Sequence, residues 1–119
     1  EGVDPAHDRV LMIEAPGEAT AAIAILNDPV GSSKDIGAAL AANMMVRSMS
    51  DGPPDDDATA QAGLDAALMA GSTWISTNFP EKTAGRSFFL TMPGGNPSRC
   101  NPVTAPKSCT AKDIEDLGP

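Results

Sequence analysis

The only histidine of the chain, His7, lies between two aspartates, Asp4 and Asp8. A histidine beside carboxylates can bind a metal ion or act as a general base near neutral pH. Aspartates at the start of a helix have a simpler role, because they cap its first turn and complement its dipole. We interpret this cluster as the start of a helix rather than as a catalytic or metal site.

Serines that could serve as nucleophiles occur in Gly31-Ser32-Ser33 and in Gly71-Ser72-Thr73. Neither segment matches the nucleophile elbow of hydrolases, and the single histidine leaves any Ser-His-Asp scheme with one possible base. Gly94-Gly95 is not part of a phosphate-binding loop or a dinucleotide fingerprint, and it is typical of a turn. The sequence therefore predicts no catalytic machinery and no cofactor.

Four aspartates, at positions 51, 55, 56 and 57, surround a Gly-Pro-Pro segment. Carboxylates are ligands for Ca²⁺, but the alternating ligands and closing glutamate of an EF-hand are missing. The segment is typical of a solvated loop, and its last aspartates complement the dipole of the helix that we expect next. We therefore predict a loop and no metal site.

Methionine is frequent, with six residues, whereas the aromatic residues are one tryptophan and three phenylalanines. Methionines on a helix could form an adaptable docking groove or ligate a haem iron, but filling gaps in an aromatic-poor core is the favoured interpretation. The aromatic residues could form the core or anchor a partner, and the sequence leaves both open. The candidate partner-binding residues are Met44, Met45, Trp74, Phe79, Phe88 and Phe89.

The two cysteines, Cys100 and Cys109, lie nine positions apart in a stretch that contains prolines and serines. Their spacing differs from a redox CxxC motif, and two cysteines with one distant histidine do not make a zinc site. We predict a disulfide; the alternative is two free thiols in a cytosolic protein. The chain begins at Glu1 rather than Met, which fits a mature product after removal of a leader or a trimmed chain.

Acidic residues outnumber basic ones by 16 to 8, which gives a net charge of −8. The basic residues are scattered singly, so the sequence disfavours nucleic acid and anionic membrane surfaces as partners. No apolar run approaches the roughly 20 residues that a membrane-spanning helix needs. We predict a protein of an oxidising, extracytoplasmic compartment, either secreted, periplasmic or within an organelle lumen.

Apolar residues recur at helical spacing in several segments. We expect helices over 5–15, 18–26, 32–49 and 58–75, although the apolar run at 10–13 would suit a buried strand equally well. A strand is expected at 86–92. Thr110 with Asp113 three residues later predicts a last short helix ending near Leu117.

These expectations combine into a mainly α fold. Residues 1–92 would form a small helical body of three to four helices, with a central antiparallel pair at 32–49 and 58–75. The possible edge strand at 86–92 would close this body. Residues 93–119 would form an irregular, turn-rich tail held by the disulfide.

The stretch from Cys100 to Leu117 combines a disulfide-sized loop with Cys109-Thr110-Ala111 and an acidic helical end. It resembles the C-terminal region of minor type IV pilins and covers under a fifth of the chain. The apolar N-terminal helix with an early glutamate, which defines pilins, is absent. The resemblance implies a pilin-like filament subunit as one alternative function.

The main functional expectation is a non-catalytic structural or accessory subunit of an extracytoplasmic or organelle-lumen assembly. It would bind a protein partner through an apolar helical face, because the alanine-rich core buries little area by itself. The alternative is a carrier of a small apolar ligand or pigment in the seam between the helices. An enzyme with an unrecognised site is the least favoured hypothesis.

Overall fold

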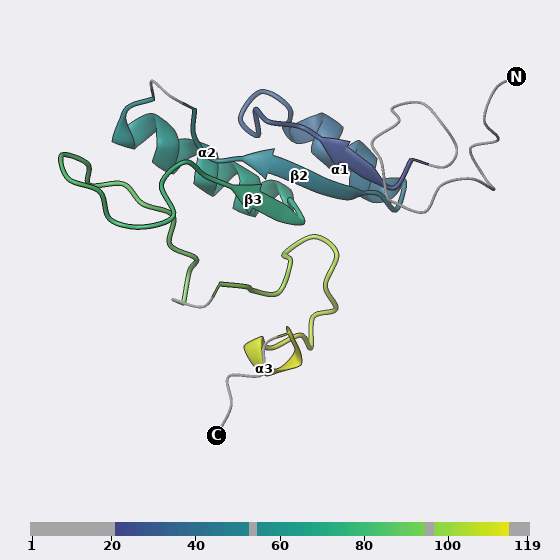
Figure 1. Ribbon diagram of the computed structural model, residues 1–119. Coiled ribbons are helices and arrows are strands. Elements are labelled where there is room, and N and C mark those ends of the chain that lie inside the picture. The colour runs from purple at the N-terminus through teal and green to yellow at the C-terminus, as the bar shows by residue number, and fades with distance from the viewer. Residues whose placement is uncertain (1–20, 53–54, 95–96, 115–119) are drawn as a thin grey trace, which may run out of the picture.

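A computed structural model describes residues 21–52, 55–94 and 97–114 of the chain. Three parallel strands form one sheet of order β1-β2-β3, with β1 at Ile23–Ile25, β2 at Met45–Met49 and β3 at Trp74–Ser76. Helix α1, Ser33–Ala41, connects β1 to β2, and α2, Asp57–Ala70, connects β2 to β3. A short helix, α3 at Ala111–Ile114, lies in the tail (Figure 1).

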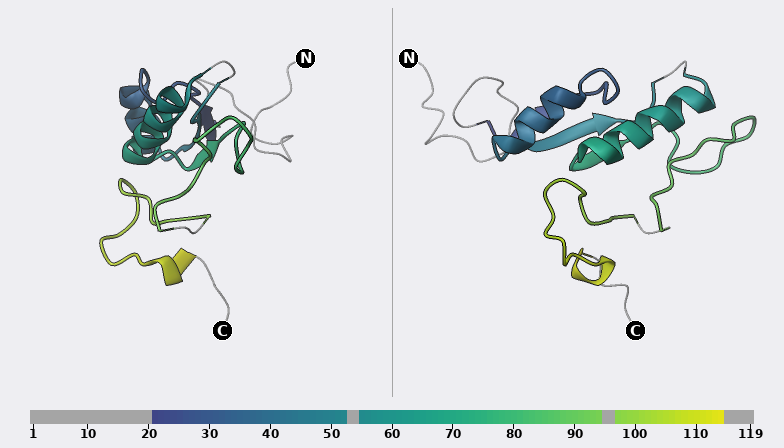
Figure 2. Two further views of the ribbon diagram at one scale, coloured as in Figure 1. Left: turned by 90° about the vertical axis from the view of Figure 1, so that its left-hand side faces the viewer. Right: turned by 180° about the vertical axis from the view of Figure 1, so that it is seen from behind.

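The expectation of a mainly α fold with a central antiparallel helix pair is therefore wrong. The chain folds into two consecutive βαβ units, which make a mixed α/β architecture. Each helix returns the chain between parallel strands, so α1 and α2 run in the same direction. Both helices cover one face of the sheet, and none of the described helices lies on the opposite face (Figure 2).

The expected helix over 32–49 ends at Ala41. Its apolar spacing continues through Met44, but Asn43 adopts a left-handed conformation with φ of 59°, and the amide of Met44 donates to the Ala39 carbonyl oxygen at 3.0 Å. The next residues form the central strand, which pairs with both neighbours. Met45–Met49 is a strand because its backbone forms hydrogen bonds with two neighbouring strands. The helical spacing of its apolar side chains is too weak a preference to outweigh these bonds.

Two other expected elements also differ. The alanine-rich segment at 18–26 contributes strand β1 within its described part, because pairing with β2 offers its backbone partners that a short helix would lack. Residues 86–92 are not a strand of the sheet, although the amide of Leu90 donates to the Phe79 carbonyl oxygen at 2.8 Å. The expected helix at 5–15 lies outside the described residues.

Helix α2 begins and ends on clear signals. The Asp56 carboxylate accepts a hydrogen bond from the Thr59 amide at 2.7 Å, which caps the N-terminus. The helix ends at Gly71, whose φ of 83° is accessible to glycine without strain. The predicted helix at 58–75 is thus confirmed in its first part, and β3 replaces its last turn.

Alternation along each strand divides the sheet into two faces. Ala24, Val46, Ser48 and Ile75 point toward the helices, and Val46 and Ser48 are fully buried there. The core under this face consists of Ile36 of α1, of Ala60, Leu64, Ala67 and Leu68 of α2, and of Phe88. The other face, which we call the open face, carries Ile23, Ile25, Met45, Arg47, Met49, Trp74 and Ser76.

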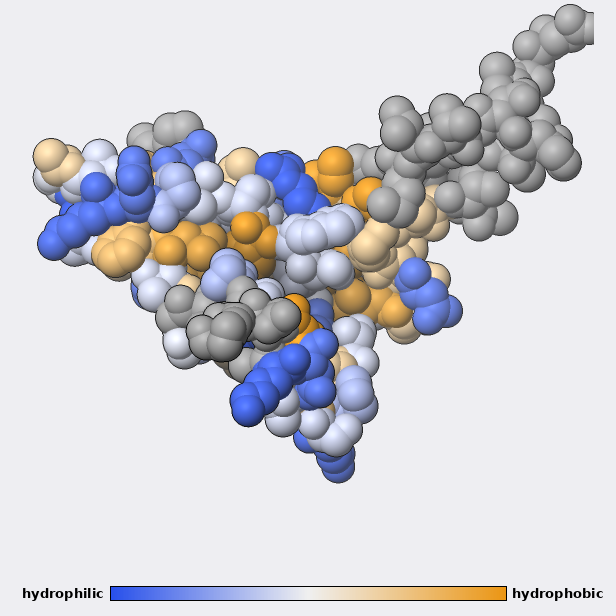
Figure 3. Space-filling view, turned by 60° about the horizontal axis from the view of Figure 1, so that its bottom comes forward, coloured by the Kyte–Doolittle hydropathy of each residue, from blue (hydrophilic) through white to orange (hydrophobic). Residues whose placement is uncertain are grey.

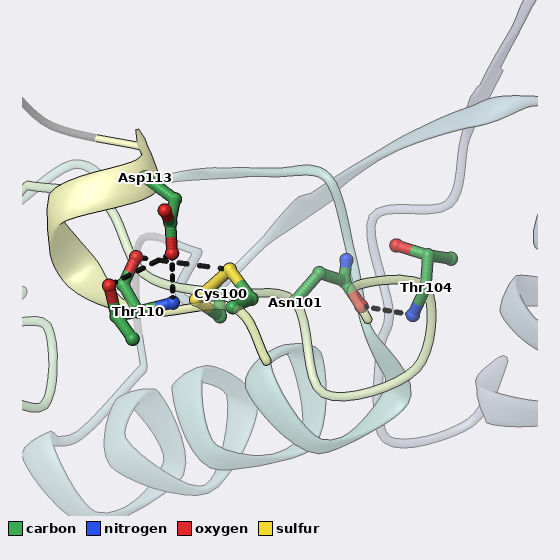
Figure 4. The surroundings of a disulfide bond; sticks show 6 residues. Cys100, Asn101, Thr104, Thr110 and Asp113 are labelled. Atoms are coloured by element: carbon green, nitrogen blue, oxygen red, sulfur yellow. Dashed lines mark hydrogen bonds between the residues drawn. A yellow bond between two sulfur atoms is a disulfide. The ribbon is translucent and has the colours of Figure 1, made fainter. Parts of the chain in front are cut away.

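The tail contains the predicted disulfide between Cys100 and Cys109, whose Cα atoms are 6.0 Å apart. Asn101 beside it donates from its side chain to the Gly71 carbonyl oxygen at 2.6 Å, which ties the tail to the end of α2. Figure 4 shows the surroundings of the disulfide, with Asn101 and Thr104 on one side of Cys100 and with Thr110 and Asp113 on the other. Thr110 donates its amide to the Asp113 carboxylate at 2.6 Å, so the predicted start of the last helix is confirmed. In the described part of the chain, no helix is long and apolar enough to cross a membrane.

Candidate functional site at the carboxyl ends of the strands

Polar residues follow each strand of the sheet where the three carboxyl ends meet. Asn27 comes after β1, Ser50 and Asp51 after β2, and Thr77 and Asn78 after β3. In open parallel sheets, ligands bind outside the carboxyl ends of the strands, because the loops there bring together side chains from separate parts of the sequence. This edge is therefore the candidate functional site.

Asp51 is the centre of a hydrogen-bond network that joins the ends of β2 and β3. Its side chain is nearly fully buried, with 3% of the residue exposed. The carboxylate accepts hydrogen bonds from the Ser50 hydroxyl at 2.7 Å, from the Asn78 amide at 2.9 Å and from the Thr77 hydroxyl. The Asn78 side chain donates to the same carboxylate at 3.0 Å. Such a carboxylate is fully occupied as an acceptor.

Burial raises the pKa of Asp51, but the hydrogen bonds from Thr77, Asn78 and Ser50 together outweigh it and hold the pKa below its usual value. Asp51 is thus a charged structural group near neutral pH, and its protonation would weaken every bond that it accepts. A general base needs a lone pair facing the substrate, and this carboxylate has its oxygens committed to the protein. We assign Asp51 the role of fixing the loop after β2 against the loop after β3.

Arg47 brings a positive charge to the carboxyl ends of the strands. It lies on the open face of the central strand, opposite Trp74 of β3, and is half-buried. One guanidinium nitrogen donates to the Asn27 side chain at 3.0 Å, so the charged group reaches the carboxyl end of β1. Among the described residues Arg47 forms no ion pair. Its remaining donors are therefore available to an anion, for which a guanidinium offers paired hydrogen bonds.

A cavity of about 350 Å³ lies beside this edge, between the loop after β1 and the start of α2. Asp28, Asp51 and Asp55 line it, but each carboxylate already accepts hydrogen bonds: Asp28 from the Gly31 amide at 3.0 Å and Asp55 from the Gly52 amide at 2.7 Å. Within residues 21–52, 55–94 and 97–114, no group of three or more histidines, cysteines, aspartates or glutamates could hold a metal ion.

The last aspartates of the acidic loop have structural partners. Asp56 caps α2, and Asp57 forms an ion pair with Arg86 at 2.9 Å and accepts hydrogen bonds from the Ser87 amide and hydroxyl, both at 2.6 Å. The Ser87 hydrogen bonds lower the pKa of Asp57 to about 2. These two aspartates therefore stabilise the N-terminus of α2 and attach Arg86 and Ser87 to it.

The candidate partner-binding residues are distributed over two regions. Phe88 is buried and packs edge-to-face against Phe79, with ring centroids 6.4 Å apart, while the Arg86 guanidinium lies 3.9 Å from the Phe79 ring. Met45 and Trp74 lie on the open face, and Trp74 is 46% exposed. Met44 is half-buried before β2, and Phe89 is exposed. A partner-binding role for all six stays a prediction.

The sequence analysis did not identify Arg47, Asn27 or Asn78 as candidate site residues. A pattern of short apolar strands that alternate with helices, each strand followed by polar residues, would have indicated them. The prediction of one helix over 32–49 obscured this pattern, because it placed Arg47 on the surface of a helix. His7, which the sequence analysis weighed as a possible base, lies outside the described residues.

Comparison with known proteins gives one match. The family model described as PI-PLC-C1, phosphoinositide phospholipase C, Ca²⁺-dependent, matches residues 2–102. This is a different family from the pilins that the C-terminal stretch resembles. Searches of curated proteins and of solved structures found no match to the chain. Because the match extends over most of the sequence, the chain belongs to the family of Ca²⁺-dependent phosphoinositide phospholipases C.

Proposed function

We propose that this chain serves the phosphodiester chemistry of its family by binding a phosphate group of an inositol phospholipid at Arg47. The observation that carries the proposal is the position of this guanidinium, which lies on the open face and reaches Asn27 at the carboxyl end of β1. Family membership supplies the class of ligand. The chain's net charge of −8 repels anions in general, so binding depends on this local cation.

The second part of the proposal is that the described residues bind but do not cleave. Phosphodiester cleavage needs a base, and the described carboxylates at this edge accept hydrogen bonds from the protein. The family description names Ca²⁺, but the described residues do not fit this ion, because they offer no group of carboxylates free to coordinate it. No step through Ca²⁺ is therefore assigned to them.

The test is a titration of the full, oxidised chain with inositol 1-phosphate, followed by calorimetry or NMR. Arg47→Gln should weaken binding by about tenfold or more, because a hydrogen bond to a charged group contributes about 1.5–3 kcal/mol. Lys34→Gln is the matched control, since Lys34 is an exposed cation at the start of α1. Equal affinities for wild type and Arg47→Gln would refute the assignment.

A companion assay adds phosphatidylinositol vesicles and Ca²⁺ to the same chain and measures the release of inositol phosphate. We expect no turnover. Turnover that Arg47→Gln abolishes and Lys34→Gln preserves would overturn the non-catalytic part of the proposal, while leaving the phosphate contact in place.

A second candidate is the accessory subunit of an extracytoplasmic assembly, with a protein as its partner. The apolar surface that favours it is the open face of the sheet, where Trp74 is 46% and Ile25 is 41% exposed. Exposed large apolar groups on one surface are typical of interaction sites. The disulfide supports an oxidising, secreted or lumenal location. Co-purification of a defined partner, lost on Trp74→Asp, would favour this candidate.

A further inference from the structure

A second, larger cavity of about 540 Å³ lies between β3 and the tail, away from the carboxyl ends of the strands. Its volume is within the range of roughly 300–1,000 Å³ that is usual for small-molecule sites. One wall consists of the end of α2 and β3, and the other consists of the disulfide loop and α3. Figure 3 shows apolar residues gathered along the body next to the projecting tail.

The walls of this cavity are mostly apolar. Leu68, Trp74 and Ile75 contribute from the body, and Leu90, Met92 and Ile114 from the later part of the chain. Methionine and leucine side chains adapt their shape to flexible hydrocarbon, whereas a rigid polar ligand would leave its hydrogen-bonding groups unpaired against them. The lining therefore suits a hydrocarbon chain.

Among the described residues, the lining of the cavity contains one charged side chain, and it is positive. Arg99 lines the cavity and is half-buried, and among the described residues it forms no hydrogen bond and no ion pair. Within the described part of the chain, no aspartate or glutamate lines the cavity. A partly desolvated cation without a counter-ion favours an anionic ligand group, because the low dielectric of its surroundings strengthens that attraction.

We propose that this cavity binds one long-chain fatty acid. Its hydrocarbon chain lies between β3 and the disulfide loop, and its carboxylate pairs with Arg99. Arg47 does not line this cavity, because its guanidinium reaches away from β3 to Asn27 at the carboxyl end of β1. The cystine forms part of the wall, because both Cys100 and Cys109 line the cavity.

Trp74 provides the measurement, since it is the only tryptophan, the chain has no tyrosine, and its side chain lines the cavity. The oxidised full chain is titrated with a bromine-labelled long-chain fatty acid below its micelle concentration, and the quenching of Trp74 fluorescence is followed. We expect saturable quenching with one molecule bound per chain. Quenching that rises linearly without saturation would overturn the proposal.

Variants separate the head-group contact from simple partitioning into an apolar surface. Arg99→Gln should weaken binding by about tenfold or more, and Arg99→Lys should restore most of it, because the charge is kept. Lys107→Gln, an exposed cation of the same loop, is the matched control and should leave the affinity unchanged. An affinity that Arg99→Gln does not change would overturn the proposal.

Two further arms complete the test. A fatty alcohol of equal chain length should bind about tenfold more weakly, since it lacks the charge that Arg99 pairs with; equal binding would overturn the assignment of the carboxylate. Arg47→Gln should leave fatty-acid binding unchanged. The fatty-acid site and the phosphate site therefore succeed or fail independently.

Discussion

At the scale of single residues, Asp51, Asp56 and Asp57 are held as charged hydrogen-bond acceptors by the protein itself. Asp51 closes the ends of two strands, Asp56 caps α2, and Asp57 fixes the segment that follows Arg86. These aspartates are clustered in the sequence, but in the folded protein each one makes contacts with a different part of the chain. Each depends on ionisation, which makes the local structure sensitive to acid.

The Asp57 contact predicts a pH dependence. Because its pKa falls to about 2 in the folded protein from an ordinary value of 3.8, ionised Asp57 stabilises the folded state above pH 3.8, and this contribution is lost as the pH falls toward 2. The amide signal of Ser87, followed by NMR, should titrate with a midpoint near 2. In Asp57→Asn this titration should vanish. A midpoint near 3.8 in the wild type would show that the contact does not form in solution.

At the scale of elements, the position of α2 against β2 is set by a close backbone approach. A methyl group added at Gly63 would lie 2.1 Å from the Ser50 carbonyl oxygen, which belongs to the backbone and cannot move aside. Gly63 therefore lets α2 lie directly over the residues that precede Asp51. Helix packing and the geometry of the candidate site are coupled at this contact.

This coupling predicts opposite effects for two glycine substitutions. Gly63→Ala should destabilise the protein by about 1–3 kcal/mol or more, because it forces α2 away from β2. Gly37→Ala, in α1 with nothing within 4 Å of the added methyl group, should stabilise it by about 0.5–1 kcal/mol through helix propensity. Urea unfolding of both variants measures the difference. Similar stabilities would contradict the packing of α2.

At the scale of the whole molecule, the sheet with its two helices and the disulfide-bonded tail are joined by few contacts. The described polar link is the hydrogen bond from Asn101 to the carbonyl oxygen of Gly71. The parallel sheet obtains its hydrogen bonds and its core from residues before the tail, Phe88 included. The disulfide should therefore matter to the tail more than to the body.

Cys109→Ser tests this division. Opening a loop of about ten residues removes a constraint of roughly 2–3 kcal/mol on the unfolded chain, so the tail should exchange its amide hydrogens faster. The helical circular dichroism of α1 and α2 should persist. Cys100→Ser should behave identically, because either change breaks the same bond. Global unfolding of either variant at room temperature would contradict the division into body and tail.

Local signals in the sequence predicted several parts of this structure. The start of α2, the pairing of Cys100 with Cys109 and the contact between Thr110 and Asp113 were all predicted correctly. Each depends on groups a few residues apart, whose chemistry is nearly the same in any fold. Strands β1 and β3 have three residues each, which is too short for a period of two to be recognised.

The sequence by itself determined the acidic start of α2, the start of α3, the disulfide and the acidic character of the protein. Only the tertiary structure decided that Met45–Met49 is the central strand, that Arg47 meets Asn27, and that Asp51 meets Thr77 and Asn78. The physical reason is that a parallel strand satisfies its backbone through partners more than 20 residues away, beyond a helical crossover. A side chain at the carboxyl edge gains its neighbours only when those distant strands have paired.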